Sequence, residues 1–277
     1  MIEILTYSFV QNALIGAFFT SIICGVLGSL IVVNRMVFIA GGIAHSVYGG
    51  VGIASFLGFS VLLGAGLFSI LCAFILAYIM LYAKERLDSL IGSLWAFGMA
   101  LGIILVELTP GYNKDFMGYL FGSILSITPQ DIILMISFMV LLLGFVIFNY
   151  RIILGISYDS EFTKLKGINT NFFGIIMMVL IALGIVISMR CVGIILIIAL
   201  LSIPAYCCEL FTNSLAKMMI FSSLISLINM ILGIFVSYLY DFQAGASIVM
   251  LLSIFSFCLT LFYHLNHRSI FSHSKGY

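Results

Sequence analysis

Long apolar stretches, separated by a few ionisable residues, run along the whole chain. Between Glu3 and Arg35 lie 31 uncharged residues, which is enough for one membrane helix of about 20 residues. The 48 residues between Arg35 and Lys84 are enough for two, with a turn at Gly58-Phe59-Ser60. Six further uncharged stretches each fit one helix: 89–106, 132–150, 167–189, 191–208, 218–240 and 242–267. The pattern predicts an all-α polytopic membrane protein with about nine transmembrane helices, and eight is the nearest alternative.

Composition narrows the class of protein. Of 277 residues, 64% are hydrophobic and 8% are charged, and the mean hydropathy is +1.31. A soluble domain has about 45–50% apolar and about 25% charged residues. A soluble enzyme, a disordered chain and a disulfide scaffold are therefore excluded, and residues 1–277 are expected to form a single transmembrane domain. The net charge of +1 gives no sign of a nucleic-acid partner.

Lysine and arginine predict the orientation, because they are enriched in cytoplasmic loops. With the N-terminus outside, only Lys114 and Arg190 lie on the outer side. The inner loops and tail then hold nine basic residues: Arg35, Lys84, Arg86, Arg151, Lys164, Lys166, Lys217, Arg268 and Lys275. We expect a multi-pass protein of the cytoplasmic (inner) membrane with its C-terminus inside. Residues 264–277 would form a cytoplasmic tail; its three histidines could bind metal, but a partly disordered tail is the preferred interpretation.

Two connections between the predicted spans are long. The outer one covers residues 108–130, and its apolar part, 116–127, is too short to cross and is predicted to be re-entrant or interfacial. The inner one covers 150–170 and is the most polar part of the chain. Within it, residues 157–168 place acids before bases, which suits a helix dipole, and Gly167 suits a helix end. We predict a short cytoplasmic helix there.

The chain lacks the motifs of an enzyme that uses nucleotides. It has no GxxxxGK[ST] phosphate-binding loop, no HExxH, no GxSxG and no CxxC. Few ionisable residues lie inside the spans, so a proton relay is not evident. We predict a transport subunit that is not itself an enzyme and whose energy comes from another subunit.

Four blocks of the sequence resemble the zinc/manganese class of ABC importer permeases. The first is Met36–Leu57, MVFIAGGIAHSVYGGVGIASFL. The others follow in order: DSLIGSLWAFGMALGIILVELTPGYNKDFMGYLFGSIL from Asp88, VGIILIIALLSIPA from Val192 and YLYDFQAGASIVMLLSIF from Tyr238. The resemblance covers roughly residues 10–265. It implies a homodimeric, type II ABC-importer-like permease with two cytoplasmic ATPases. An extracytoplasmic binding protein would deliver Zn²⁺, Mn²⁺ or sometimes Fe²⁺, and no cofactor is permanently bound.

The resemblance also gives the inner helix a role. It looks like the coupling helix on which the ATPases of such importers act. Phe162 and Leu165 lie three residues apart and share a face, as an apolar pair for a partner groove would. An ordinary solvated loop is the alternative. The predicted coupling residues are Asp159, Glu161, Phe162, Lys164, Leu165 and Gly167.

His45 is the main candidate for contact with the ion. It is the only histidine before the tail and falls near the middle of the second span, on a helix with glycines at 41, 42, 49 and 52. Either these small residues serve close helix packing, with His45 bonding across the interface, or the imidazole is a metal ligand on the ion path. Many proteins that the chain resembles carry Asp four residues before this histidine, where this chain has Gly41.

Other candidates for the ion path are Glu107, Asp115 and Tyr119, near the outer Pro110-Gly111 turn, although solvated loop charges would look the same. Glu209 follows two cysteines, but adjacent residues point apart on a helix, so a metal role there is disfavoured. The six cysteines are expected to be small apolar filler. Asp241 is expected to be a cap or loop residue.

A divalent-metal importer permease is thus the leading function. The alternatives are an ABC permease for an organic metal chelate or cobalamin, and an ion-coupled secondary transporter that needs no ATPase.

Overall fold

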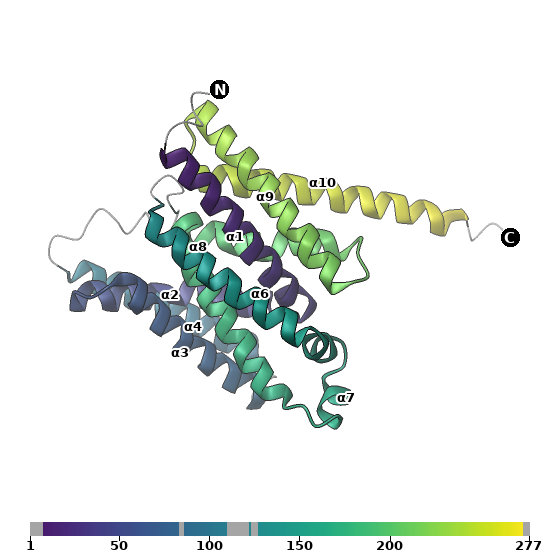
Figure 1. The fold of residues 1–277 in the computed structure, drawn as a ribbon, viewed down its shortest axis with the longest axis horizontal. Helices are drawn as coiled ribbons and strands as arrows, with labels where there is room; N and C mark the ends of the chain where they lie inside the picture. The colour runs from purple at the N-terminus through teal and green to yellow at the C-terminus, as the bar shows by residue number, and fades with distance from the viewer. Residues whose placement is uncertain (1–7, 83–85, 110–121, 123–126, 274–277) are drawn as a thin grey trace.

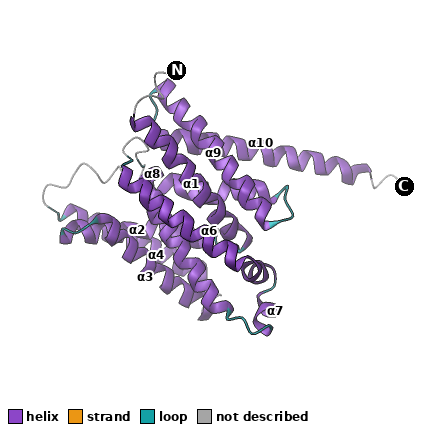
Figure 2. Cartoon of the chain, in the orientation of Figure 1, coloured by secondary structure: helices purple, strands orange, loops and turns teal. Residues whose placement is uncertain are grey.

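The computed structural model describes residues 8–82, 86–109, 122 and 127–273, and these residues form helices joined by short connections, without a strand (Figure 2). Eight of the helices in these ranges are long and apolar enough to cross a membrane, and one is short. The helices are α1 (Ser8–Val33), α2 (Val37–Leu57), α3 (Val61–Tyr82), α4 (Leu87–Glu107), α6 (Pro129–Tyr158), α7 (Ser160–Leu165), α8 (Thr170–Glu209), α9 (Leu215–Tyr240) and α10 (Ala244–His273).

Local sequence explains where the helices begin and end. Most of the helices consist largely of apolar residues. In lipid such a segment forms a helix because a helix satisfies its own backbone hydrogen-bonding groups. α2 ends at Gly58, whose φ of 73° is left-handed and suits a residue without Cβ. The predicted turn at 58–60 is therefore confirmed. α6 begins with Pro129 after a capping box, in which Thr128 and Asp131 each satisfy the other's backbone N–H.

α8 crosses the bundle twice, which reconciles eight long helices with nine predicted crossings. Gly193 interrupts its 40 residues with φ 78° and ψ 165°. Before this break, Arg190 pairs with Asp131 at the start of α6. After it, Glu209 shares a cavity with Tyr158 at the far end of α6. The chain therefore reverses near Gly193, and the prediction of about nine membrane helices is confirmed.

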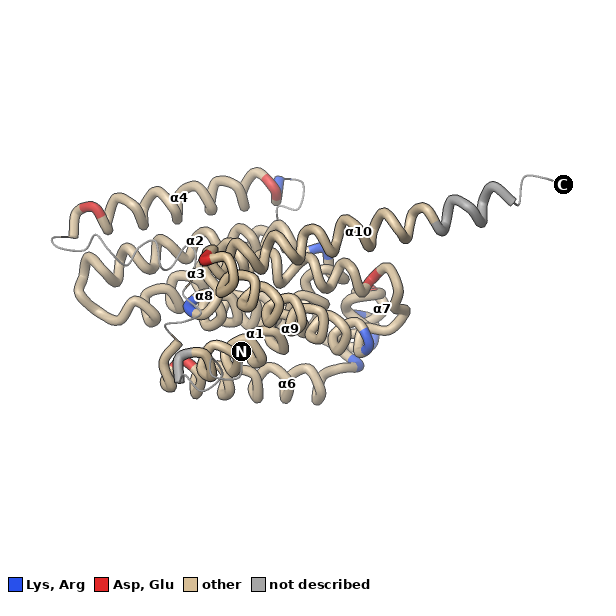
Figure 3. Tube along the Cα trace, turned by 90° about the horizontal axis from the view of Figure 1, so that it is seen from above, with Lys and Arg blue, Asp and Glu red and all other residues tan. Residues whose placement is uncertain are grey.

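Two groups of helices make up the bundle (Figure 1). α1, α6, α8 and α9 lie together, and α2, α3 and α4 form a second group that contacts α8. Arg35 lines a cavity with Tyr158 at the end of α6, and Ala216, next to Lys217, donates its N–H to Tyr150 of the same helix. Figure 3 shows basic residues around α7, which follows α6 and carries Lys164, and we call this end the basic end. Arg190 lies at the opposite end, beside Asp131.

Two expected boundaries differ in the structure. The helix predicted over 157–168 is only six residues long, because α6 continues to Tyr158 and the backbone turns at Gly167 with φ 81°. A partly disordered tail is expected from residue 264, but α10 continues to His273. α10 projects past the other helices (Figure 1). Residues 268–273 thus extend the helix beyond the predicted span 242–267.

Glycines bring α2 and α4 into close contact. A Cβ on Gly98 would lie 2.6 Å from Ser46 Cα, and one on Gly52 would lie 2.6 Å from Gly102 Cα. Ser46 Oγ donates to Leu94 O at 3.2 Å and so links the two helices further. Small residues let membrane helices approach this closely, where lipid gives no hydrophobic drive for association. Gly52 of α2 thus serves close helix packing, as one of the two interpretations predicts, whereas His45 Nδ1 makes no hydrogen bond across the interface.

Gly102→Ala tests this contact, because the new methyl group would collide with the backbone oxygen of Tyr48. We expect a loss of about 1–3 kcal/mol, as for other overpacked sites, and a lower melting temperature. Gly92→Ala on the same helix is the control, since nothing lies within 4 Å of its Cβ position. It should be neutral or stabilising by about 0.5–1 kcal/mol. Equal melting temperatures of the two variants in thermal unfolding would contradict the packing.

Candidate functional site

His45 lies near the middle of α2 with its ring half-buried. Its Nδ1 is buried and has no hydrogen-bond partner. A buried polar atom without a partner is costly in an apolar medium. An ionisable side chain at this depth is usually retained for function. The structure therefore leaves an unused ligand atom at mid-span.

Trp95 of α4 covers one face of this ring. The two ring centroids are 4.0 Å apart and the planes differ by 9°, so the rings are stacked in parallel. The indole is held in turn, because Trp95 Nε1 donates to Met99 Sδ at 2.9 Å. The sequence reading missed Trp95. Its only signal is that it is the single tryptophan of the chain.

The surroundings of His45 are poor in other ligands. Among the described residues, no group of three or more His, Cys, Asp or Glu could hold a metal ion. Gly41 lies one turn before His45, and a Cβ atom added to it would have no other atom within 4 Å. The recess that Gly41 lines is otherwise almost wholly apolar, with Ile31, Val37, Ala40, Ile198, Leu201 and Ser202. An ion at His45 would thus not be held by a cluster of three or more such ligands from these residues.

The other predicted path residues are not brought to His45. Glu107 is the exposed last residue of α4, 12 residues past Trp95, or about 18 Å along the helix. Asp115 and Tyr119 lie outside the described residues. Glu209 is at the basic end, where it lines a cavity of about 230 Å³ with Arg35 and Tyr158. Asp241 caps α9 in the left-handed region, with φ 55°, which confirms the cap interpretation.

α7 is a short, capped helix with an exposed apolar pair. Asp159 Oδ1 accepts the Phe162 N–H at 2.9 Å and caps the helix. Thr163 is buried against Gly155, which fixes the helix to α6. Phe162 and Leu165 are 54% and 86% exposed, so the apolar pair is free to contact a partner. Glu161 and Lys164 are exposed as well, and Lys166 Nζ lies 4.5 Å from the Phe162 ring centroid.

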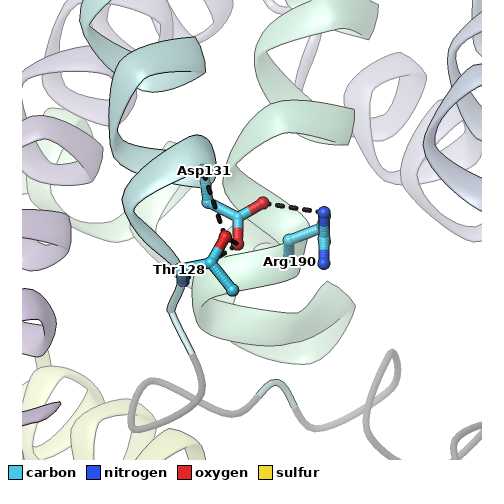
Figure 4. A network of polar contacts seen from close by, with 3 residues as sticks. All are labelled: Thr128, Asp131 and Arg190. Atoms are coloured by element: carbon cyan, nitrogen blue, oxygen red, sulfur yellow. Dashed lines mark hydrogen bonds and ion pairs between the residues drawn. The ribbon is translucent and has the colours of Figure 1, made fainter.

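A polar network holds the α8 reversal to the start of α6 (Figure 4). Arg190 Nη1 lies 2.7 Å from Asp131 Oδ1, and Asp131 Oδ2 accepts from Thr128 N at 3.1 Å and Thr128 Oγ1 at 2.7 Å. Arg190 is three residues before Gly193, where the backbone reverses. The sequence analysis uses both charges as span boundaries and Arg190 also for orientation, but it does not predict that they pair. Their pairing needs residues 59 apart in the chain to meet.

A comparison with protein families decides the class. The model of the ABC 3 transport family matches residues 6–263. The chain belongs to this family. The resemblance to metal ABC permeases is thereby confirmed.

Named relatives and a solved structure agree with this assignment. The chain is 38% identical to an uncharacterised membrane protein of Synechocystis, over 92% of this chain and 90% of that protein. It is 33% identical to the manganese transport system membrane protein MntC of Halalkalibacterium halodurans, over 94% and 89%. The structure of PsaBC from Streptococcus pneumoniae in complex with Fab is similar, with a TM-score of 0.84, 33% identity and 93% of each chain covered. As a member of the ABC 3 family, the chain is a multi-pass permease of the ABC type.

Gly41→Asp tests whether His45 faces a place where an ion fits. The carboxylate and the imidazole would stand at i and i+4 on one face of α2, and the open space at Gly41 admits the side chain. We expect tighter Mn²⁺ and Zn²⁺ binding to the purified chain, with equal or slower transport, because an ion must also leave its site. Gly41→Asn is the control of equal size without the charge. If both variants bind metal equally well, the carboxylate does not reach the ion.

Proposed function

We propose that this chain is the transmembrane subunit of an importer that carries a divalent transition-metal ion into the cytoplasm, driven by ATP hydrolysis in partner subunits. The unpaired His45 Nδ1 at mid-span is the observation that carries the proposal. Imidazole is a ligand for several transition metals but not for alkali or alkaline-earth ions. Relatives named as manganese transport proteins support Mn²⁺ as the first ion to test. Zn²⁺ is the second, because an imidazole by itself binds Zn²⁺ more tightly than Mn²⁺.

The basic end would face the cytoplasm. Basic residues favour the cytoplasmic side, and α7 lies at that end. The N-terminus would then lie outside and the C-terminus inside, in the cytoplasmic membrane. The sequence has no phosphate-binding loop, so ATP would be hydrolysed by two separate cytoplasmic subunits that contact α7. A second copy of the chain and an extracytoplasmic metal-binding protein would complete the importer.

His45→Ala tests the ion path directly. We expect reduced ⁵⁴Mn²⁺ uptake per folded transporter, because the variant removes the one ligand at mid-span. His45→Phe should reduce uptake more, since the larger ring fills the space beside the small residues of α2. His264→Ala, which removes an exposed histidine of α10, is the control and should transport normally. If His45→Ala transports at the normal rate per folded molecule and is only less stable, His45 serves packing and not transport.

The double variant Phe162→Asp, Leu165→Asp tests coupling. The two exposed side chains would act as anchors in a groove of the ATPase, and such anchors each contribute about 2 kcal/mol or more. We expect loss of ATPase co-purification and of uptake, with an unchanged melting temperature of the membrane domain. Phe172→Asp, at an equally exposed phenylalanine in the first turn of α8, is the control. Normal ATPase binding and uptake in the double variant would show that α7 is not the coupling element.

A further inference from the structure

The orientation of the His45 ring depends on a second side chain. A metal bonds to an imidazole in the plane of the ring, along the nitrogen lone pair. Whatever fixes that plane therefore fixes where an ion can sit. Trp95 lies parallel to the ring at 4.0 Å, and no hydrogen bond holds Nδ1. The indole face is the contact that defines the plane.

Trp95 is itself well placed to act as a rigid support. Its Nε1–H donates to Met99 Sδ, one turn further along α4. Three residues after Trp95, Gly98 packs directly on the backbone of Ser46, the neighbour of His45. Ser46 Oγ also donates to the carbonyl oxygen of Leu94, the neighbour of Trp95. Three contacts thus hold the two rings in register from both helices.

We propose that Trp95 is a positioning residue for the transported ion. It holds the His45 imidazole in the orientation that accepts the metal, and its electron-rich face stabilises the positive charge that the ring gains on metal binding. The ligand is a divalent transition-metal ion. This inference rests on the proposed function. In metal sites, groups that orient a histidine ligand commonly change affinity about 10–100-fold when they are removed.

A purely structural role for Trp95 gives a different expectation. As filler between α2 and α4, it would affect the fraction of folded protein and the melting temperature. It would not affect the metal affinity of the molecules that remain folded. Metal affinity of the folded chain is therefore the measurement that separates the two roles.

The test uses the purified full chain in lipid nanodiscs with Mn²⁺ as the probe, and free Mn²⁺ is counted by its electron paramagnetic resonance signal. We expect Trp95→Leu to weaken Mn²⁺ binding by about tenfold. Trp95→Phe, which keeps an aromatic face, should stay within about twofold of the wild type. Phe97→Leu is the matched control, because Phe97 is on the same helix but 60% exposed, and it should bind as the wild type does. Wild-type affinity in Trp95→Leu would overturn the positioning role.

The single tryptophan supplies an independent readout. Paramagnetic Mn²⁺ quenches an indole only at short range, so wild-type fluorescence should fall along the same binding curve as the resonance signal. The quench should disappear in His45→Ala. Mn²⁺ binding without a matching quench, or no saturable binding at all, would overturn the inference. Failure of the proposed function is recognised separately, by ⁵⁴Mn²⁺ uptake that does not depend on this chain in cells.

Discussion

Close packing of α2 on α4 is the constraint on which the site depends. Glycines at 52, 98 and 102 remove the side chains that would hold the helices apart. At this short separation the rings of His45 and Trp95 meet face to face at mid-span. A wider separation would leave the imidazole free to rotate. The stacked geometry of the two rings is thus a consequence of backbone approach, supported by the hydrogen bonds of Ser46 to Leu94 and of Trp95 to Met99.

The weakness of the ligand set fits the work of a permease. A transported ion has to enter and leave, so a site with many ligands would slow turnover. Gly41 leaves open space where a carboxylate would add a ligand, and no group of three or more His, Cys, Asp or Glu in the described part of the chain could hold the ion instead. The remaining coordination would come from water or from a second copy of the chain. The Asp131–Arg190 pair and α7 lie at opposite ends of the bundle.

The spacing of charges along the sequence predicts much of the fold. It is enough to place the crossings, the turn at Gly58 and the capped helix at α7, because each depends on local composition. It cannot show that the spans before and after Arg190 share one interrupted helix, since that depends on the backbone at Gly193. It also cannot show the stack of His45 on Trp95, which joins residues 50 apart through glycine contacts between helices. Glu107 is on the same helix as Trp95, but it lies too far along α4 to reach the imidazole ring of His45.

Pulsed electron paramagnetic resonance of bound Mn²⁺ tests the central claim most directly, because it detects a nitrogen bonded to the metal. The account predicts a nitrogen modulation in the Mn²⁺-loaded wild-type chain that changes on ¹⁵N-histidine labelling and is absent in His45→Ala. His264→Ala, which removes the exposed histidine of α10, is the control and should keep the nitrogen modulation. A modulation that survives in His45→Ala, or bound Mn²⁺ without any histidine nitrogen, would contradict the assignment of His45 to the ion path.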